Sequence, residues 1–285
     1  MAITAQQVKE LREITGAGIL DAKNALVETD GDMEKAMELL RQKGMASADK
    51  KQGRIAAEGI VSSYVDGNAG ALVEVNCETD FVAKNEDFRT LVQTIARTVA
   101  ENNPADLEVL NDLKVDGTTI EVLVKEAIAT IGEKITIRRF TRFEGTLATY
   151  IHNNKIGVLL ETEGSDEALA KDVCLHIASS GSEYVSRTEI PQEVIDEETR
   201  IEMGKEDLAS KPEQIRAKIV EGRVNKLMSQ RVLLEQPFVK DPNQTIEQLV
   251  AGKVAIKRFA KYTLGEGLEK KQENFAEEVM NQIKK

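Results

Sequence analysis

The stretches 58–74, EGIVSSYVDGNAGALVE, and 144–161, EGTLATYIHNNKIGVLLE, carry the same pattern twice. With one inserted residue, the leading Glu-Gly, a tyrosine, a glycine and the closing glutamate all align. In each copy, alternating apolar residues flank a polar turn, at 66–68 (DGN) or 152–154 (HNN). Alternation around a short polar turn is typical of a β-hairpin. The chain is therefore predicted to contain an internal repeat built on two hairpins.

The repeat continues beyond the hairpins. The stretch KITIRRFTRF at 134–143 matches KVAIKRFAKY at 253–262, and both alternate like strands. Each is preceded by a helical start, TIEVLV at 119–124 or TIEQLV at 245–250. The predicted order is hairpin, helix, spacer, helix and strand, twice over. Each half should be a small antiparallel sheet with helices on one face, which makes the fold class α+β.

A separate helical module is predicted before the repeat. Thr4 can cap a first helix, with Gln7 three residues later as its capping-box partner. The Gly-Ala-Gly at 16–18 ends that helix. Three short helices with a glycine break after the first resemble a ubiquitin-associated-like fold. We expect a module at 1–50, a first core half at 51–143 and a second at 144–285.

The rest of this module is predicted from the same kind of signal. A second helix over about 19–27 is expected to bury Leu20. Asp32 is a suitable N-cap for a third helix, which is expected to stop near Gly44. The stretch 45–54 (MASADKKQGR) has no apolar periodicity and is predicted to be a linker.

The two copies differ at two places, and such differences indicate where function was added. The first copy carries about five additional residues within 76–85 (NCETDFVAKN), which we call the extra segment. The second copy carries roughly sixty additional residues between Ser180 and Thr245. Most of these are predicted to form a helical hairpin at about 191–233. A C-terminal helix is predicted at about 268–284.

The predicted helical hairpin has apolar residues at helical spacing on both of its helices. The first helix carries Val194, Ile195, Ile201 and Met203, and the return helix carries Ile215, Ile219, Val224, Leu227 and Met228. Such a pattern is typical of a projecting antiparallel coiled coil.

Composition excludes several classes of protein. The chain has 285 residues with 38 basic and 49 acidic side chains, a net charge of −11. This charge argues against bare nucleic acid as the main partner, because phosphate binding depends on Lys and Arg. No apolar run approaches the roughly 20 residues that span a bilayer. The N-terminus has no secretory apolar region either, so we expect a cytoplasmic protein and no membrane partner.

Motifs for chemistry are missing. There is no phosphate loop and no Gly-x-Gly-x-x-Gly after a strand, so we expect no direct nucleotide binding, no cofactor and no enzyme activity. Cys77 and Cys174 are expected to be buried structural thiols, and His176 a core residue. His152 falls in the second hairpin turn, either as a plain exposed histidine or as a partner contact. No catalytic or metal-binding residues are predicted.

Asp80 and Phe81 are the remaining candidates for function. A large ring beside a carboxylate in a loop is costly to expose unless it packs somewhere. Phe81 either folds back onto its own domain or protrudes as a wedge into a partner's pocket. The position of both residues within the extra segment favours the wedge.

Three stretches together resemble bacterial elongation factor Ts. They are KELREITGAG at 9–18, EVNCETDFVAKN at 74–85 and GEGLEK at 265–270, and the resemblance extends over essentially the whole chain. The stretch LDAK at 20–23 departs from the family's commoner Met-Asp-Cys-Lys and affects only local helix contacts.

The resemblance implies a guanine-nucleotide exchange factor for elongation factor Tu, the GTPase that carries aminoacyl-tRNA. In the family, the Thr-Asp-Phe-Val segment dislocates the magnesium ion of the GTPase. It therefore implies this role for Thr79, Asp80, Phe81 and Val82. It also implies that the N-terminal module and the second core half contact the GTPase, and that the helical hairpin and the C-terminal helix reach toward it. The other partner contacts expected are Arg12, Ile19, Leu20, Lys23 and His152.

Two other classes of function remain open at this point. An adaptor would use the helical module and the projecting hairpin only to join partners, and it predicts no effect on nucleotide release. A hydrolase would use Asp80, but no general base or metal ligand lies near it in the sequence.

Overall fold

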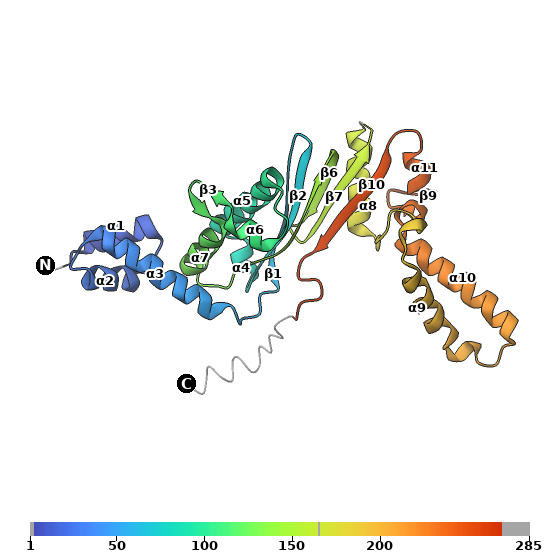
Figure 1. Cartoon of the computed structure of the whole chain (residues 1–285), viewed down its shortest axis with the longest axis horizontal. Helices are drawn as coiled ribbons and strands as arrows, with labels where there is room; N and C mark the ends of the chain where they lie inside the picture. The colour runs from blue at the N-terminus through green and yellow to red at the C-terminus, as the bar shows by residue number, and fades with distance from the viewer. Residues whose placement is uncertain (1–2, 165, 270–285) are drawn as a thin grey trace.

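The structure is a computed structural model that describes residues 3–164 and 166–269. It is elongated, with the N-terminal helices at one end, the sheets in the middle and a helical hairpin at the other end (Figure 1). The helices are α1 (Ala5–Thr15), α2 (Ile19–Glu28), α3 (Met33–Lys51), α4 (Asp80–Ala83), α5 (Glu86–Asn102), α6 (Leu107–Asp112), α7 (Ile120–Ile131), α8 (Glu167–Ser179), α9 (Gln192–Met203), α10 (Glu213–Arg231) and α11 (Ile246–Val250). The strands are β1 (Glu58–Asp66), β2 (Ala69–Cys77), β3 (Lys114–Val115), β4 (Thr118–Thr119), β5 (Thr136–Glu144), β6 (Thr146–His152), β7 (Ile156–Glu163), β8 (Pro237–Phe238), β9 (Asp241–Thr245) and β10 (Ala255–Thr263).

The N-terminal module has its own small core. The capping box of Thr4 and Gln7 is present at the start of α1, as predicted. The buried residues of the module are Leu11, Ala22, Ala25, Leu26 and Ala36. The expectation that Leu20 is buried was wrong, because 72% of its surface is exposed. The buried positions of α2 lie on one side of a helix of 3.6 residues per turn, and Leu20 lies on the other.

The third helix is longer than predicted and replaces most of the expected linker. Helix α3 continues through Gly44 to Lys51. The stretch 45–51 is rich in alanine and lysine and has no proline, so its intrinsic helix propensity is high. Gly44 serves close packing instead of ending the helix, since a Cβ there would lie 2.7 Å from the Cβ of Ala129 in α7. The module is therefore joined to the core by a continuous helix.

The predicted duplication is confirmed by the sheet topology. One sheet has the order β1-β2-β5 and the other β10-β7-β6, and every pairing is antiparallel. The hairpin turns follow Asp66 and His152, at the expected places. Helices α4 and α5 cover the first sheet, and α8 covers the second. Each half thus has its own layer of helices over a three-stranded sheet.

The two sheets pack face to face through a shared apolar layer. Its buried members are Val61, Leu72, Phe143, Leu159 and Tyr262. The glycines matched in the repeat, Gly70 and Gly157, make room for it. A Cβ on Gly157 would lie 2.5 Å from Val61, and one on Gly70 would lie 2.7 Å from Leu147. The core is therefore a four-layer arrangement of helix, sheet, sheet and helix.

The spacer of each half contains a short β-ribbon that the sequence did not reveal. Strands β3 and β4 pair just before α7, and β8 and β9 pair just before α11. Strands β3, β4 and β8 have two residues each, too few to show alternation, and β9 reads DPNQT, a polar stretch without apolar alternation. The repeat extends further than the matched stretches indicated.

The inserted helical hairpin consists of α9 and α10, with 3-10 turns at 206–208 between them and at 187–189 and 233–235 near its base. Its buried residues form a separate cluster, namely Ile190, Leu208, Val220, Val224, Met228 and Val232. Of the apolar residues expected along the two helices, Val224 and Met228 are buried, whereas Ile201, Met203 and Ile215 are exposed. Two helices bury only the narrow stripe along their contact, which excludes these positions.

The C-terminal helix predicted at 268–284 lies almost entirely outside the described residues, which end at 269. Within the described ranges, no helix is both long and apolar enough to cross a membrane.

Candidate functional site

The extra segment forms a braced turn between the first sheet and its covering helix. Strand β2 ends at Cys77 and α5 begins at Glu86, and the short helix α4 lies between them. Thr79 caps α4 by accepting a hydrogen bond from the Val82 N–H at 3.4 Å. Val82 is buried in the core of the first half, whereas 78% of the Phe81 surface is exposed. The ring does not fold back onto its own domain.

Asp80 and Lys84 flank the exposed ring. The Lys84 Nζ donates to Asp80 Oδ2 at 2.7 Å and lies 5.8 Å from the centre of the Phe81 ring. The hydrogen bond from Lys84 lowers the pKa of Asp80, and the more distant charge of Lys155 lowers it further. Asp80 is therefore an ionised carboxylate beside an apolar ring at physiological pH. The site presents the Asp80–Lys84 ion pair and one large apolar ring to solvent.

The second hairpin turn lies beside the first half of the core. The Asn154 carbonyl accepts a hydrogen bond from the Val61 N–H of β1 at 2.8 Å. His152 is exposed, and its ring lies 6.1 Å from that of Tyr150 in a stacked orientation. Within this turn the Lys155 N–H donates to the His152 carbonyl at 2.9 Å. The charge of Lys155 reaches Asp80, so the turn lies near the extra segment.

The N-terminal candidates lie together on the opposite part of the molecule from the helical hairpin. Arg12, Ile19 and Lys23 line one groove formed by α1 and α2. Leu20 is exposed on the same module, as are Ile14 and Val27, which sequence reasoning did not single out as contacts. Ile19, Leu20 and Val27 share one face of α2 at helical spacing and form an exposed apolar surface of the kind that partners cover. Ile14 instead borders a cavity between α2, α3 and α7.

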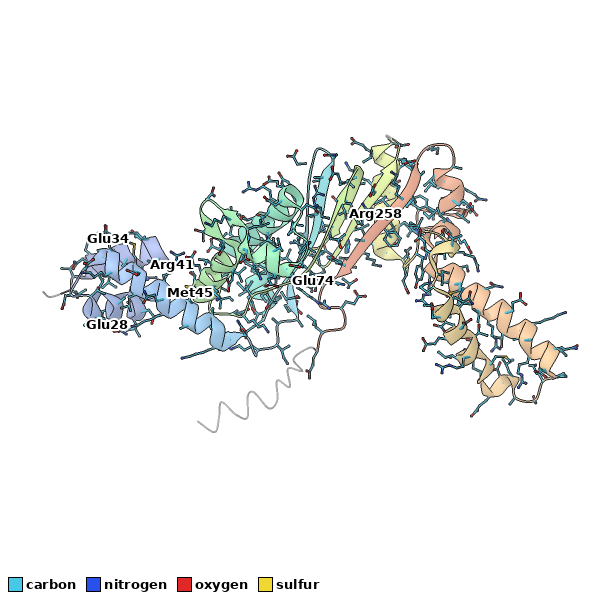
Figure 2. All side chains as sticks on the ribbon, in the orientation of Figure 1. Glu28, Glu34, Arg41, Met45, Glu74 and Arg258 are labelled. Carbon is cyan, nitrogen blue, oxygen red and sulfur yellow. The ribbon has the colours of Figure 1, made fainter. Side chains whose placement is uncertain are left out.

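The module is fixed against the core close to this surface. The Arg41 guanidinium lies 2.9 Å from the Glu126 carboxylate, which joins α3 to α7. Glu28, Arg41 and Met45 border a cavity that lies between α2, α3 and α7 (Figure 2). A Cβ on Gly16 would lie 2.8 Å from a methyl group of Thr130, so this end of α1 also approaches α7 closely. The groove of the module thus has a defined position relative to the core.

The two cysteines and His176 are structural, as predicted. Cys77 and Cys174 are buried, and burial raises the pKa of each thiol to about 12. Burial also lowers the pKa of His176, whose Nε2 lies 2.8 Å from the Gln236 side-chain oxygen. In residues 3–164 and 166–269, no group of three or more His, Cys, Asp or Glu is placed to hold a metal ion.

Sequence reasoning missed one residue of the site. Glu133, just after α7, accepts hydrogen bonds from the backbone and side chain of Thr79. The two residues are 54 positions apart, so no local pattern connects them. The repeat did contain a signal for Glu133. When Lys134 is aligned with Lys253, the preceding residue is Glu133 in the first copy and Gly252 in the second, so the carboxylate occurs only in the copy that has the extra segment.

Comparison with known proteins supports one family. The family model described as elongation factor TS matches residues 78–266. Elongation factor Ts of Alkalilimnicola ehrlichii is 50% identical over 100% of this chain and 99% of its own length. That of Thioalkalivibrio sulfidiphilus is also 50% identical with the same coverage, and that of Burkholderia multivorans is 48% identical over 99% of this chain and 97% of its own length. With its duplicated core and the turn that exposes Phe81, the chain belongs to the elongation factor Ts family.

Proposed function

We propose that this chain, a member of a family of translation elongation factors, is a guanine-nucleotide exchange factor for the GTPase elongation factor Tu. In this role it binds the GDP-loaded GTPase, displaces the magnesium ion in its nucleotide site and speeds the release of GDP. The observation that carries the proposal is the exposure of Phe81 on a turn that is otherwise anchored in the core.

The physics of exchange requires no nucleotide site on the factor. A protein that binds the empty GTPase more tightly than the loaded one weakens nucleotide binding by the ratio of its two affinities, because the two equilibria are linked. GDP is held largely by magnesium and by backbone amides around its phosphates. An apolar ring inserted into that region offers the ion no oxygen ligand and the phosphates no N–H donor, and the Asp80 carboxylate beside it would repel the phosphates. No covalent bond is made or broken in such a step.

The remaining exposed residues would supply affinity. The apolar surface with Ile19 and Leu20, rimmed by Arg12 and Lys23, suits a partly apolar protein surface. His152 would add a contact from the second half. Val82 would contribute by anchoring the turn, since its side chain lies in the core. A cytoplasmic location follows from a partner that works in translation.

The test is the rate at which fluorescent GDP leaves elongation factor Tu in a stopped-flow experiment. The intact chain should accelerate release, and Phe81→Ala should lower the saturating rate. An anchoring aromatic is worth about 2–4 kcal/mol, which corresponds to roughly 30- to 1000-fold. Val109→Ala, which truncates an exposed apolar residue on α6, is the matched control and should behave like the intact chain.

Two results would contradict the proposal. If the intact chain binds the GTPase without changing GDP release, the chain is an adaptor. If Phe81→Ala releases GDP at the normal rate but melts at a much lower temperature, the ring is a structural element and not a wedge.

A further inference from the structure

A reciprocal set of hydrogen bonds holds the base of the extra segment. The Glu133 Oε2 accepts from the Glu78 N–H at 3.1 Å and from the Thr79 N–H at 2.9 Å. Its Oε1 accepts from the Thr79 hydroxyl at 2.7 Å. In return, the Glu78 carboxylate accepts from the Lys134 N–H at 2.7 Å. Two short chain segments that are distant in sequence thus satisfy each other's backbone groups.

This brace acts on the residues that aim Phe81. Thr79 is the N-cap of α4, and Phe81 is the second residue of that helix. Hydrogen bonds to an ionised carboxylate are shorter and stronger than neutral ones, and three of them converge on Glu133. They fix the direction in which the chain leaves β2, and so the direction in which α4 presents the ring. The Glu133 side chain bonds to Glu78 and Thr79, behind the exposed ring.

The brace also reaches the N-terminal module. The Lys134 Nζ donates to the carbonyls of Gln52 and Arg54, at 2.5 and 2.9 Å. The Arg54 guanidinium donates in turn to the Glu78 carboxylate at 3.1 Å. The chain that follows α3 is therefore tied to the same point as the extra segment. The same cluster of hydrogen bonds holds both the chain that leaves the module and the turn that carries Phe81.

The second half of the core offers an internal comparison. It has no counterpart of the extra segment, since three residues, 164–166, connect β7 to α8 where eight, 78–85, connect β2 to α5. It also has no counterpart of the carboxylate, because Gly252 stands where the repeat places Glu133. Each half nevertheless forms its own three-stranded sheet with the equivalent strand order. The carboxylate accompanies the extra segment and is not needed for the shared fold.

We propose that Glu133 is a positioning residue for nucleotide exchange, which holds Thr79 and α4 so that Phe81 enters the partner in one fixed orientation. This inference rests on the proposed exchange function. Glu133 acts through Thr79 and touches neither the GTPase nor its nucleotide.

The experiment compares Glu133→Ala and Glu133→Gln with Glu121→Gln in the full chain. Glutamine can keep the geometry without the charge, because its oxygen can accept from both amides while its NH₂ donates to the Thr79 hydroxyl. Glu121 lies on α7, the helix that precedes Glu133, and is exposed, with an ion pair to Lys125 at 2.9 Å, so its glutamine variant is the matched control. Amide hydrogen exchange at residues 78 and 79 is measured on the free chain. GDP release is measured as a function of factor concentration.

In Glu133→Ala, the amide hydrogens of residues 78 and 79 should exchange faster. The saturating rate of GDP release should fall by about 10- to 100-fold, as expected when a group that must act in one geometry is displaced. The half-saturating concentration should change much less, because the main contact surface is intact. Glu133→Gln should recover most of the saturating rate, and Glu121→Gln should match the intact chain in both measurements.

The outcomes separate this inference from the proposed function. If the intact chain does not accelerate GDP release, the exchange function fails and this inference fails with it. If the intact chain is active and Glu133→Ala keeps its saturating rate, only the positioning role is wrong. If Glu133→Gln is as slow as Glu133→Ala, the charge and not the hydrogen-bond geometry is what exchange requires, which also overturns the proposal.

Discussion

The two halves of the core share one architecture and differ in what interrupts it. In both, the middle strand carries a buried glutamate, and the third strand supplies two consecutive basic residues to it. A β-bulge in the third strand, at residue 138 or 257, leaves one basic residue unpaired in the ladder. A bulge redirects side chains that would otherwise alternate between faces, so both basic residues can reach one carboxylate.

The contact between the halves repeats the same symmetry. The Arg139 guanidinium lies 4.2 Å from the ring centre of Tyr262, and the Arg258 guanidinium lies 4.2 Å from that of Phe143. Each arginine therefore lies over the aromatic residue of the other half, at matched positions of the repeat. Figure 2 shows Glu74 and Arg258 among the strands in the middle of the molecule.

The differences lie outside this shared framework. The first half adds the extra segment with Phe81, and the second adds the helical hairpin with exposed Ile201 and Ile215. What both copies retain stabilises the shared fold, and what only one copy carries is not needed for that fold. The comparison also separates residues that look alike in the sequence, such as the paired glutamates.

The largest expected effect separates Glu74 from Glu161. Glu74 is fully buried and accepts from Arg138, Arg139 and the Gly265 N–H at 2.7–2.8 Å. Burial would raise the pKa of Glu74, but these bonds outweigh burial and lower it. Glu74→Ala should cost about 3–5 kcal/mol, because it removes the acceptor of the buried Gly265 N–H and of two guanidinium groups that are largely buried.

Glu161→Ala should cost less, about 1–2 kcal/mol, because the side chains of Arg258 and Lys257 are roughly half exposed and can turn to water. Urea unfolding followed by circular dichroism measures both variants. Equal costs would mean that the two ion pairs are equivalent despite their different burial.

The next effect tests the packing between the sheets. Gly157→Ala would place a Cβ against Val61, whose branched side chain has little rotational freedom, and should cost about 1–2 kcal/mol. Gly70→Ala would meet the flexible ends of Leu147 and Leu159. Its Cβ would also lie 3.0 Å from Val65, which is exposed and can yield toward solvent, so this variant should cost less than about 1 kcal/mol. Thermal melts of the two variants measure the difference. A larger loss for Gly70→Ala would show that the layer is tighter on the first half.

A smaller effect concerns pH and is confined to the second half. The Val239 N–H donates to His176 Nδ1 at 3.2 Å, so Nε2 carries the proton and donates to Gln236. Burial lowers the pKa of His176, the Gln236 bond raises it, and the nearby charge of Lys261 lowers it. Below the ordinary histidine pKa of about 6.5, the unfolded chain binds a proton that the folded chain does not.

Stability should therefore be highest above pH 6.5 and fall as the pH drops toward 5.5. His176→Gln should flatten this slope, while His152→Gln, at an exposed position, should retain it. Urea unfolding at pH 7.5, 6.5 and 5.5 makes the comparison. A slope that survives in His176→Gln would assign the proton uptake to another group. Carboxylates with lowered pKa values, such as Glu74, lose their contribution only at more acidic pH.

The smallest effect is a gain in the helical hairpin. Gly222 lies inside α10, has no positive φ, and a Cβ there would meet nothing within 4 Å. Gly222→Ala should stabilise the chain by about 0.5 kcal/mol through the lower entropy of the unfolded state. The check is a thermal melt beside that of Gly157→Ala, which should shift in the opposite direction.

Local patterns were enough to predict a large part of this fold. The capping box at Thr4, the two hairpin turns and the matched strands depend on hydrogen bonds and alternation within a few residues. The extra segment follows from the different lengths of the two copies, and this difference alone singles out the stretch that contains Phe81. The exposure of the ring and the anchoring of Val82 depend on tertiary packing, which the length of a segment does not reveal.

The sequence by itself determined the class of the elements, the duplication and the place where the copies differ, because these are properties of neighbouring residues and of self-similarity. Only the tertiary structure decided that α3 passes through Gly44, that Leu20 and Ile201 face solvent, and that Glu133 holds Thr79. Each of these depends on which surface a residue meets from a distant part of the chain. Packing between distant elements selects one face of a helix among several that the local pattern allows, and it brings together partners that no local periodicity connects.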